Sequence, residues 1–365
     1  GMPKGVMYPG GEFCAFLTAM GANARGLEPP QQISDLAAYI AAVEAPPVSL
    51  AACPLMHGTG MWLGAMLTHL MGGACVLMES RHLDVDELWQ TVERHGVTST
   101  VIVGDAFARP MLRALDVRAE TGGAYDTSSL TTIVSSGAMF SNEVKKGLVA
   151  HIPGLTIQDI LGSTEGGMGQ NVTAADDEGP ETAKFELNPG VKVFDEHDNE
   201  VEPGSGVVGM VASTSANVPL GYYKDEEKSA RTFRENDGVR YTFHGDMATV
   251  GADGTITLLG RGSNCINTGG EKVFPEEVEE AVKTHPAVHD CLIFGIDDER
   301  FGQRVVGVAS LESDASASGD EIIEHTKAHL SHFKAPRQLV IVDNVPRAPN
   351  GKADYAGARD LSGLG

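Results

Sequence analysis

The sequence predicts an α/β fold in which a parallel sheet covered by helices is followed by a β-rich subdomain and a small C-terminal α/β domain. Three observations predict it: short apolar runs alternate with helical periods in the first half of the chain, helical periodicity stops near Asn188, and helices return after Arg261. A chain of 365 residues is long enough for two or three domains. We place them at residues 1–187, 188–260 and 261–365, with a hinge near residues 261–264.

The first predicted domain follows from five apolar runs that are short enough to be buried strands. They occupy residues 48–56, 74–78, 99–104, 131–137 and 155–161. Segments with helical periodicity lie between them, at residues 59–71, 84–95, 105–115 and 141–151. The second helix is delimited most clearly, since Asp84 can cap its start, Glu87 stands three residues on and Gly96 follows its end. Strands that alternate with helices indicate a parallel sheet with helices on both faces.

The other two domains are predicted from turn residues and helix caps. Between residues 188 and 260, Gly, Asp and Pro recur every few residues, which is typical of hairpins, and the Ala-Asp-Gly at 252–254 suits a tight turn. After residue 261, Pro275 opens a helix with acidic residues in its first turn. A small α/β domain is completed by a helix near 320–332 and by apolar strands at 289–296, 304–311 and 338–343.

Composition narrows the class of protein and its partners. The 27 Lys and Arg against 50 Asp and Glu give a formal charge of −23, which opposes binding to nucleic acid or to anionic lipid. The five cysteines show no zinc-ligand spacing, so we expect reduced thiols and a cytoplasmic location. Residues 58–78 lack Asp, Glu, Lys and Arg, but five glycines interrupt them. We therefore expect a buried helix and strand there, and no membrane span.

One motif favours a different function. A predicted strand precedes Gly58, Gly60 and Gly64, and Glu79 ends the next strand, where a dinucleotide-binding fold has the acid that contacts ribose. This arrangement leaves an NAD-dependent dehydrogenase as an alternative. The glycine spacing differs from the usual G-x-G-x-x-G, however, and no later segment suggests hydride transfer.

Five dispersed segments are more specific together than any single motif. They are Gly1-Met-Pro-Lys4-Gly5, Gly162-Ser-Thr164-Glu165-Gly-Gly, Tyr241-Thr-Phe-His-Gly245-Asp246, Gly260-Arg261 with the following Gly269-Gly270-Glu271-Lys272, and Pro346-Arg-Ala-Pro-Asn350-Gly351-Lys352. In this order and spacing they resemble the adenylate-forming (AMP-binding) superfamily over the whole chain. The stretch from 221 to 311 is most similar to acyl-CoA synthetases for fatty or bulky hydrophobic acids.

The resemblance implies a reaction in two steps. A carboxylic acid displaces pyrophosphate from the α-phosphorus of ATP, which gives an acyl-adenylate, and the thiol of CoA then takes the acyl group. Both steps concentrate negative charge, so positioned cations, Mg²⁺ among them, and hydrogen-bond donors are required. The implied cofactors and partners are therefore ATP, Mg²⁺, CoA and a carboxylic acid.

The resemblance also implies which residues contact the phosphates and the ribose. Lys4 belongs to the phosphate loop, Thr164 contacts phosphate and Glu165 holds Mg²⁺. Asp246 accepts from the ribose hydroxyls, and Arg261 lies near the same ribose. Without the other motifs, Thr164 and Glu165 would favour the start of a helix, and Asp246 would suit a turn and Arg261 a solvated surface.

A second set of residues is implied for the adenine. Ser136, Gly137 and Ala138 match the segment whose backbone flanks the base, because small residues let it approach closely. Asp159 is expected to accept from the adenine amino group. Leu161 stands where the family usually has an aromatic residue, so the stacking contribution differs here.

The remaining implied residues act on the acyl group and the thiol. His57 matches a residue near the acyl carboxylate, and Lys352 matches a lysine that the small domain carries over the acyl and α-phosphate oxygens. Gly269 and Gly270 match backbone that meets the pantetheine arm of CoA in the second step. Between the steps the small domain is expected to rotate about a hinge at Ser263, where the family commonly has a charged residue.

One departure concerns the phosphate loop. The family has a hydroxyl-rich half before Pro-Lys-Gly, and this sequence holds only the tail of that loop, Gly1 to Gly5. We therefore expect an N-terminally truncated synthetase that is weak or inactive alone, with an exposed apolar face covered by self-association or by a partner. A non-catalytic fragment that binds nucleotide or CoA is the alternative.

Overall fold

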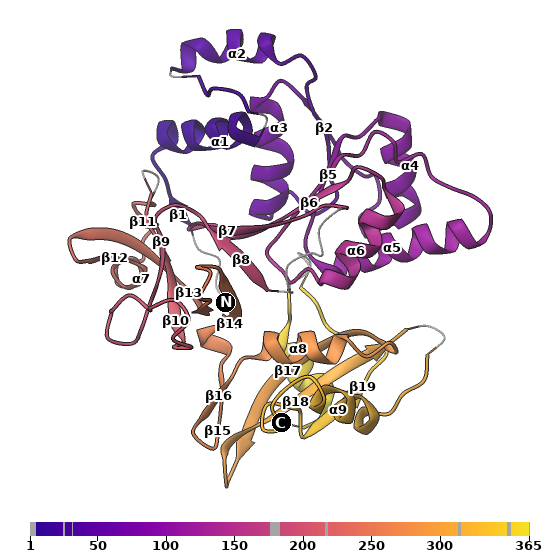
Figure 1. The fold of residues 1–365 in the computed structure, drawn as a ribbon, viewed down its shortest axis with the longest axis vertical. Helices are drawn as coiled ribbons and strands as arrows, with labels where there is room; N and C mark the ends of the chain where they lie inside the picture. The colour runs from indigo at the N-terminus through magenta and orange to yellow at the C-terminus, as the bar shows by residue number, and fades with distance from the viewer. Residues whose placement is uncertain are drawn as a thin grey trace.

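The computed structural model describes residues 5–24, 26–30, 32–175, 183–215, 218–312, 315–348 and 352–364. Three sheets lie in this part of the chain, one of 12 strands, one of five and one of two. Figure 1 shows the larger sheet with its helices in the upper part of the molecule, and the smaller sheet in the lower part with α8 (Pro275–Lys283) above it. The fold is α/β, as the sequence predicts.

The first half of the large sheet is parallel. Its strands follow the order β3 (Ala74–Val76), β2 (Val48–Ala51), β4 (Ser99–Ile102), β5 (Thr132–Ser136) and β6 (Thr156–Ser163). These are the five predicted strands, and their buried side chains, such as Leu50, Val101 and Ile133, belong to one core cluster. Because parallel strands end at the same edge, residues that follow β5 and β6 lie close together.

Helices lie on both sides of these strands in Figure 1. Trp89, Met111 and Leu148 anchor three of them in the core, and the Trp89 indole N–H donates to Met111 O. The helices that precede β3 in the chain are α1 (Gly10–Ala24), η1 (Ile33–Asp35), α2 (Leu36–Ala42), η2 (Thr59–Met66) and α3 (Leu67–Leu70). Those that follow β3 are α4 (Val85–His95), α5 (Asp105–Glu120) and α6 (Asn142–His151).

The ends of α4 agree with the prediction. Asp84 Oδ1 accepts from Glu87 N at 3.0 Å, and Gly96 ends the helix in the left-handed conformation with φ of +57°. The Glu87 carboxylate accepts from the backbone N–H groups of Glu79 and Ser80. It therefore ties α4 to the segment after β3 instead of capping its own helix.

Two glycines of the dinucleotide-like motif, Gly60 and Gly64, serve helix packing. The segment predicted as one helix at 59–71 is a π-helix, η2, that continues into α3. A Cβ on Gly60 would lie 2.7 Å from Pro54 O, and one on Gly64 would lie 3.0 Å from Ala51 Cβ. Only glycine lets η2 lie this close to β2 and to the residues after it. No helix within the described ranges is long and apolar enough to cross a membrane.

The predicted β-rich segment continues the large sheet. β7 (Gly166–Thr173) pairs antiparallel with β6, and the next strands follow in the order β8 (Lys184–Leu187), β14 (Ile256–Arg261), β13 (Val239–Val250), β10 (Gly209–Ser213) and β9 (Val191–Phe194). β12 (Phe233–Asn236) also pairs with β13, α7 (Glu226–Thr232) precedes it, and β1 (Val6–Met7) pairs with β11 (Gly221–Tyr222). Because β8 pairs with both β7 and β14, the predicted β-rich segment and the parallel strands form one continuous sheet. This sheet brings residues of the two segments to the same region.

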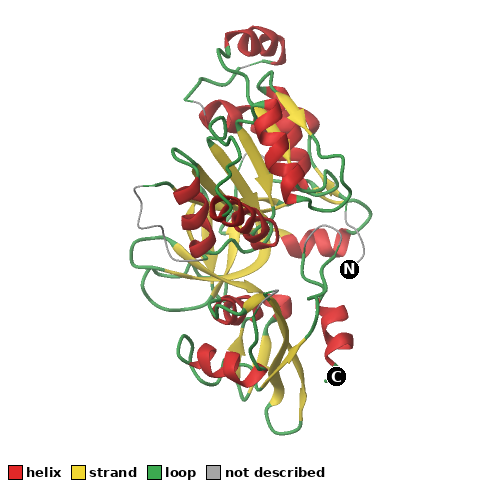
Figure 2. Ribbon diagram, turned by 90° about the vertical axis from the view of Figure 1, so that its right-hand side faces the viewer, coloured by secondary structure: helices red, strands yellow, loops and turns green. Residues whose placement is uncertain are grey.

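The small sheet has helices on its two faces, which Figure 2 shows in the lower part of the molecule. Side chains alternate along its longest strand: Cys291 and Ile293 pack in one core cluster, and Leu292 and Phe294 pack in another with Ala358 of α10. The elements are η3 (Gly262–Asn264), β15 (Ile266–Thr268), β16 (Glu271–Val273), α8 (Pro275–Lys283), β17 (Val288–Asp298), β18 (Gly302–Leu311), α9 (Gly319–Lys327), β19 (Gln338–Ile341) and α10 (Tyr355–Ser362).

Candidate active site

A cavity of about 1590 Å³ lies at the carboxyl edge of β5 and β6 and is closed on one side by residues of the small sheet's part of the chain. Ten of the predicted site residues line it: His57, Ser136, Gly137, Ala138, Asp159, Thr164, Glu165, Asp246, Arg261 and Lys352. Gly269 and Gly270 form the turn between β15 and β16 and are not among its lining residues. Lys4 falls outside the described residues.

Thr164 and Glu165 form the turn between β6 and β7, so they do not start a helix. The Thr164 hydroxyl donates to Glu165 Oε2 at 2.9 Å, and the Tyr222 hydroxyl donates to Glu165 Oε1 at 2.6 Å. Tyr8 donates to Thr164 O at 2.9 Å. Burial and the nearby Glu165 charge both raise the pKa of Tyr222, which keeps this donor protonated. Two hydroxyls thus orient the carboxylate in the cavity.

Asp246 and Arg261 stand opposite each other on β13 and β14. Arg261 Nε lies 2.9 Å from Asp246 Oδ1, and Arg261 Nη1 donates to His244 O. Asp246 Oδ2 is buried and has no hydrogen-bond partner among the described residues. Burial raises the pKa of Asp246, while Arg261 acts to lower it. A buried acceptor of this kind is costly unless a ligand supplies donors.

His244 lies beneath this pair and has partners on both ring nitrogens. Its Nδ1 is 3.1 Å from Ser163 Oγ, and its Nε2 is 2.7 Å from Ser213 Oγ. Burial lowers the pKa of His244 to about 4, so the imidazole is neutral at pH 7. The histidine, on β13, thereby connects its strand to β6 and β10.

The segment after β5 allows a close approach to His57. Gly137 has φ of +91°, and a Cβ there would lie 2.9 Å from His57 Cε1. The Thr59 N–H donates to His57 Nδ1 at 3.2 Å, which leaves the proton of the neutral ring on Nε2. Burial and the Lys352 charge lower the pKa of His57. The neutral imidazole therefore presents an N–H donor at this side of the cavity.

Asp159 is held by a residue that the sequence analysis did not single out. Lys145 Nζ, on α6, lies 2.7 Å from Asp159 Oδ2, and both side chains are buried. Burial raises the pKa of Asp159 to about 6, and the Lys145 charge opposes that shift. One oxygen of this carboxylate is therefore already engaged by a cation.

Lys352 reaches the cavity from the loop before α10. Burial by the cavity walls and the Arg261 charge lower the pKa of Lys352, while Glu165 and Asp246 act to raise it. The lysine nevertheless remains exposed to solvent. The two parts of the chain are thus oriented with Lys352 next to the residues predicted to bind nucleotide.

Four residues that support the site were not predicted from the sequence: Tyr8, Lys145, Tyr222 and His244. His244 had a signal, since it lies inside the segment that ends in Gly245-Asp246. Tyr222 is 57 residues from its partner Glu165, and no local pattern marks it. Such partners become visible only when the strands are assembled.

The geometry has counterparts among known proteins. The pattern of the AMP-binding enzyme family matches residues 1–223, and that of the AMP-binding enzyme C-terminal domain matches residues 277–352. This chain belongs to the AMP-binding enzyme family. The resemblance seen in the five dispersed segments is therefore confirmed.

Two relatives give the range of similarity. A 3-oxocholest-4-en-26-oate–CoA ligase of Rhodococcus rhodochrous is 45% identical over 315 residues, which are 85% of this chain and 56% of that protein. A medium/long-chain-fatty-acid–CoA/3-oxocholest-4-en-26-oate–CoA ligase of Mycolicibacterium smegmatis is 39% identical over 366 residues, 99% of this chain and 65% of that protein. The chain spans less than two thirds of the length of these relatives.

Solved structures support the fold. The amide bond synthetase McbA from Marinactinospora thermotolerans superposes with a TM-score of 0.76 at 21% identity, over 99% of this chain and 67% of that one. ATP-bound MatB from Rhodopseudomonas palustris gives 0.71 at 22% identity, over 98% and 67%. Neither these structures nor the relatives support the dehydrogenase alternative or a non-catalytic binding fragment.

Proposed function

We propose that this chain forms the nucleotide site of an ATP-dependent acyl-CoA synthetase that activates a fatty or bulky hydrophobic carboxylic acid. The observation that carries the proposal is the meeting of Glu165, Asp246 and Lys352 in one cavity. The named relatives are CoA ligases for medium/long-chain fatty acids and for a steroid acid, which supports the substrate class.

The free oxygen of Asp246 supports a nucleotide in this cavity. A ribose has two neighbouring hydroxyls, and one of them would satisfy the buried Oδ2 that has no partner in the described part of the chain. Arg261 would then fix the other carboxylate oxygen and contribute positive charge near the same sugar. Ser136, Gly137 and Ala138 would flank the adenine, with Asp159 near its amino group, and Lys4 would contact phosphate.

Glu165 suits a magnesium ion that arrives with the nucleotide. The described residues contain no group of three or more His, Cys, Asp or Glu arranged to hold a metal. Mg²⁺ commonly binds through one or two carboxylates together with substrate phosphates and water, and the oriented Glu165 carboxylate fits that donor set. When bound, the ion would neutralise charge on the departing pyrophosphate.

In the proposed first step, a carboxylate oxygen of the acid bonds to the α-phosphorus of ATP and pyrophosphate leaves. Lys352 donates hydrogen bonds to the acyl and α-phosphate oxygens, which gain charge, and Thr164 contacts the phosphates. His57 presents its Nε2–H to the acyl carboxylate. In the second step the CoA thiolate sulfur bonds to the acyl carbonyl and AMP leaves.

We assign the two steps to two orientations of the small domain. The proposed domains are residues 1–187, 188–260 and 261–365, with a hinge near 261–264, where η3 separates the two sheets. The observed orientation has Lys352 in the cavity and suits the first step. Rotation would withdraw Lys352 and bring Gly269 and Gly270, whose φ values are +61° and +90°, toward the pantetheine arm.

The acyl group would occupy the apolar lobe of the cavity. Phe13, Phe16 and Leu17 of α1 and Trp62 of η2 line this lobe. Phe13 and Trp62 pack edge to face with ring centroids 5.0 Å apart. A wall of this kind favours bulky hydrophobic acids over short polar ones.

Two further proposals concern the setting of the protein. Met56 and Phe16 line the cavity and are exposed, with Met56 81% exposed, and Met61 of η2 is exposed as well. We propose that self-association or a partner covers them, which sedimentation of the purified chain would test. All five cysteines are free, which supports the proposed cytoplasmic location.

The function is tested by separating the two half-reactions. An enzyme in which this chain is completed at its N-terminus is supplied with ATP, Mg²⁺ and a panel of fatty and steroid acids, and pyrophosphate release is measured. We expect Lys352→Ala to lower this rate by about 10²–10³-fold, as for a lost transition-state donor. Thioester formation from supplied acyl-adenylate should change little.

Three outcomes count against the proposal. Equal losses in both half-reactions would reject the role of Lys352. AMP binding without pyrophosphate release by any acid would favour the non-catalytic binding fragment. Failure to bind AMP would reject the nucleotide site itself.

A further inference from the structure

The loop that carries Lys352 is closed on itself at its base. Arg347 and Ala353 form a β-bridge, and the Ala348 N–H donates to Lys352 O at 2.8 Å. Immediately after the loop, the Asp354 carboxylate caps α10 by accepting from Gly357 N at 3.0 Å. The position of the Lys352 backbone therefore depends on the residues that fix the chain before the loop, at Arg347, and after it, at Tyr355.

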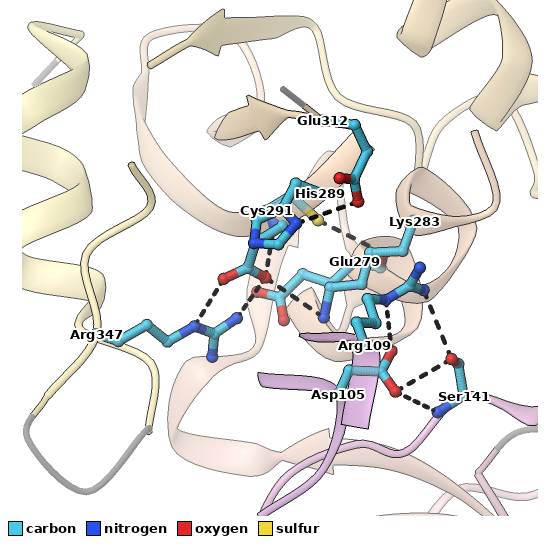
Figure 3. Close-up of polar contacts among 10 residues, drawn as sticks. Asp105, Arg109, Ser141, Glu279, Lys283, His289, Cys291, Glu312 and Arg347 are labelled. Carbon is cyan, nitrogen blue, oxygen red and sulfur yellow. Dashed lines mark hydrogen bonds and ion pairs between the residues drawn. The ribbon is translucent and has the colours of Figure 1, made fainter. Parts of the chain in front are cut away.

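The first side is fixed by a paired Arg347 and Asp290. Arg347 Nε lies 2.9 Å from Asp290 Oδ2, and Arg347 Nη2 lies 2.6 Å from Asp290 Oδ1. Both side chains are about four-fifths buried, with 22% and 21% exposed. Such two-point pairing fixes direction as well as distance. Figure 3 shows Arg347 directed toward the strand that carries His289 and Cys291, with Glu279 and Lys283 nearby.

The surrounding charges keep Asp290 ionised. Burial acts against ionisation, but Lys283 and Arg347 outweigh it and lower the pKa of Asp290. Lys283 Nζ lies 3.8 Å from Asp290 Oδ1 and is itself buried. The pair is therefore built into the small domain and does not resemble a loose surface contact.

The second side is fixed by Tyr355, at the start of α10. Its hydroxyl donates to Glu279 Oε1 at 3.1 Å, and the same oxygen accepts from the backbone N–H of Ile293 at 3.0 Å. Glu279 is only 7% exposed. Arg347 and Tyr355 thus bind the two sides of the loop to neighbouring carboxylates on β17 and α8.

We propose that Arg347 and Asp290 are positioning residues that hold the Lys352 loop in the geometry required for adenylation. The inference rests on the proposed function of Lys352. A lysine side chain has four rotatable bonds, so its ammonium is placed well only when its backbone is fixed. Errors of about 1 Å in such placement can cost about 10²-fold in rate. The proposed rotation would withdraw Lys352 from the cavity before the second step, so the pair should matter little there.

The test compares Arg347→Gln with Arg234→Gln. Arg234 makes an equally close two-point pair with Asp198, at 2.7 Å on both nitrogens, but neither residue lines the cavity. We expect Arg347→Gln and Asp290→Asn to slow pyrophosphate release about 10–100-fold. Thioester formation from supplied acyl-adenylate should be nearly unchanged, and Arg347→Lys should recover part of the loss. Arg234→Gln should leave both half-reactions unchanged.

A second measurement does not need turnover. Exchange of the Ala348 amide hydrogen, which is bonded to Lys352 O, is followed by mass spectrometry in the same variants. We expect faster exchange in Arg347→Gln and wild-type exchange in Arg234→Gln. Wild-type exchange in Arg347→Gln would overturn the proposal, and so would equal loss in both half-reactions.

The outcomes separate this inference from the function on which it rests. If Lys352→Ala slows adenylation selectively and Arg347→Gln does not, the positioning role fails and the function stands. If Lys352→Ala has no selective effect, the proposed function fails. The amide exchange then still decides whether Arg347 holds the loop.

Discussion

At the scale of single residues, burial decides the charge of His244. The ring is 7% exposed and lies between two serine hydroxyls, and its pKa is lowered to about 4 from an ordinary value of 6.5. The unfolded chain therefore binds a proton at this residue between pH 6.5 and 4 that the folded chain does not. Folding stability from this group is complete above pH 6.5 and is lost as pH falls toward 4.

We expect His244→Gln to remove that pH dependence. Relative to the variant, the wild-type protein should lose up to about 3 kcal/mol of unfolding free energy between pH 7 and pH 4. Urea unfolding at several pH values measures the difference in unfolding free energy between wild type and variant. The contributions of the other buried carboxyl groups are the same in both proteins and cancel in this difference. Ser213→Ala keeps the buried imidazole and should retain the wild-type dependence. A constant difference between wild type and His244→Gln would contradict the expectation.

At the scale of elements, η2 can lie close to the residues after β2 because Gly60 has no side chain. A Cβ at Gly60 would lie 2.7 Å from Pro54 O and 3.0 Å from Cys53 O. Backbone oxygens cannot rotate away, so a methyl group there must displace η2. Because Thr59 at the start of η2 bonds to His57, that displacement also moves the imidazole.

Gly60→Ala should therefore lower the unfolding free energy by about 1–3 kcal/mol, as overpacking does. Gly11→Ala in α1 is the matched control, since a Cβ there meets nothing within 4 Å. That control should be neutral or stabilise by up to about 1 kcal/mol, because alanine favours helix over glycine. Chemical denaturation of both variants makes the comparison. Equal effects of the two substitutions would mean that η2 is not closely packed.

At the scale of the whole molecule, an ion pair joins the large and small parts beside the cavity, which His289 lines. Arg113 Nη1 of α5 lies 2.6 Å from Glu312 Oε2, and His289 Nδ1 lies 3.1 Å from the other oxygen of Glu312. Figure 3 shows Glu312 and His289 together on the small part. The Arg113 side chain is 50% exposed, so the contact is a surface pair of modest strength.

Arg113→Gln should weaken the observed orientation. A surface pair contributes at most about 1 kcal/mol, so we expect adenylation to fall about two- to five-fold and thioester formation to hold or rise. The effect should shrink in high salt. Arg118→Gln serves as the control, because Arg118 lies on the same helix and stacks on Tyr125 of the large part. A similar loss in both half-reactions would show that the pair does not select an orientation.

The sequence by itself determined the elements and the residue types of the candidate site. Alternating apolar runs predicted the five parallel strands, and Asp84 and Gly96 predicted the ends of α4, because periodicity and capping are local properties of the chain. Motif spacing predicted which residues to examine, and ten of them line one cavity. Their individual roles remain predictions.

Only the tertiary structure decided how those elements join and which groups support the site. The antiparallel strands continue the parallel sheet because β8 pairs with both β7 and β14, a register that neither strand encodes alone. The hydroxyl of Tyr222 on Glu165 and the pair of Arg347 with Asp290 each join residues 57 apart in the chain. Hydrogen bonds and burial over such separations depend on packing of the whole fold, so no local pattern could have predicted them.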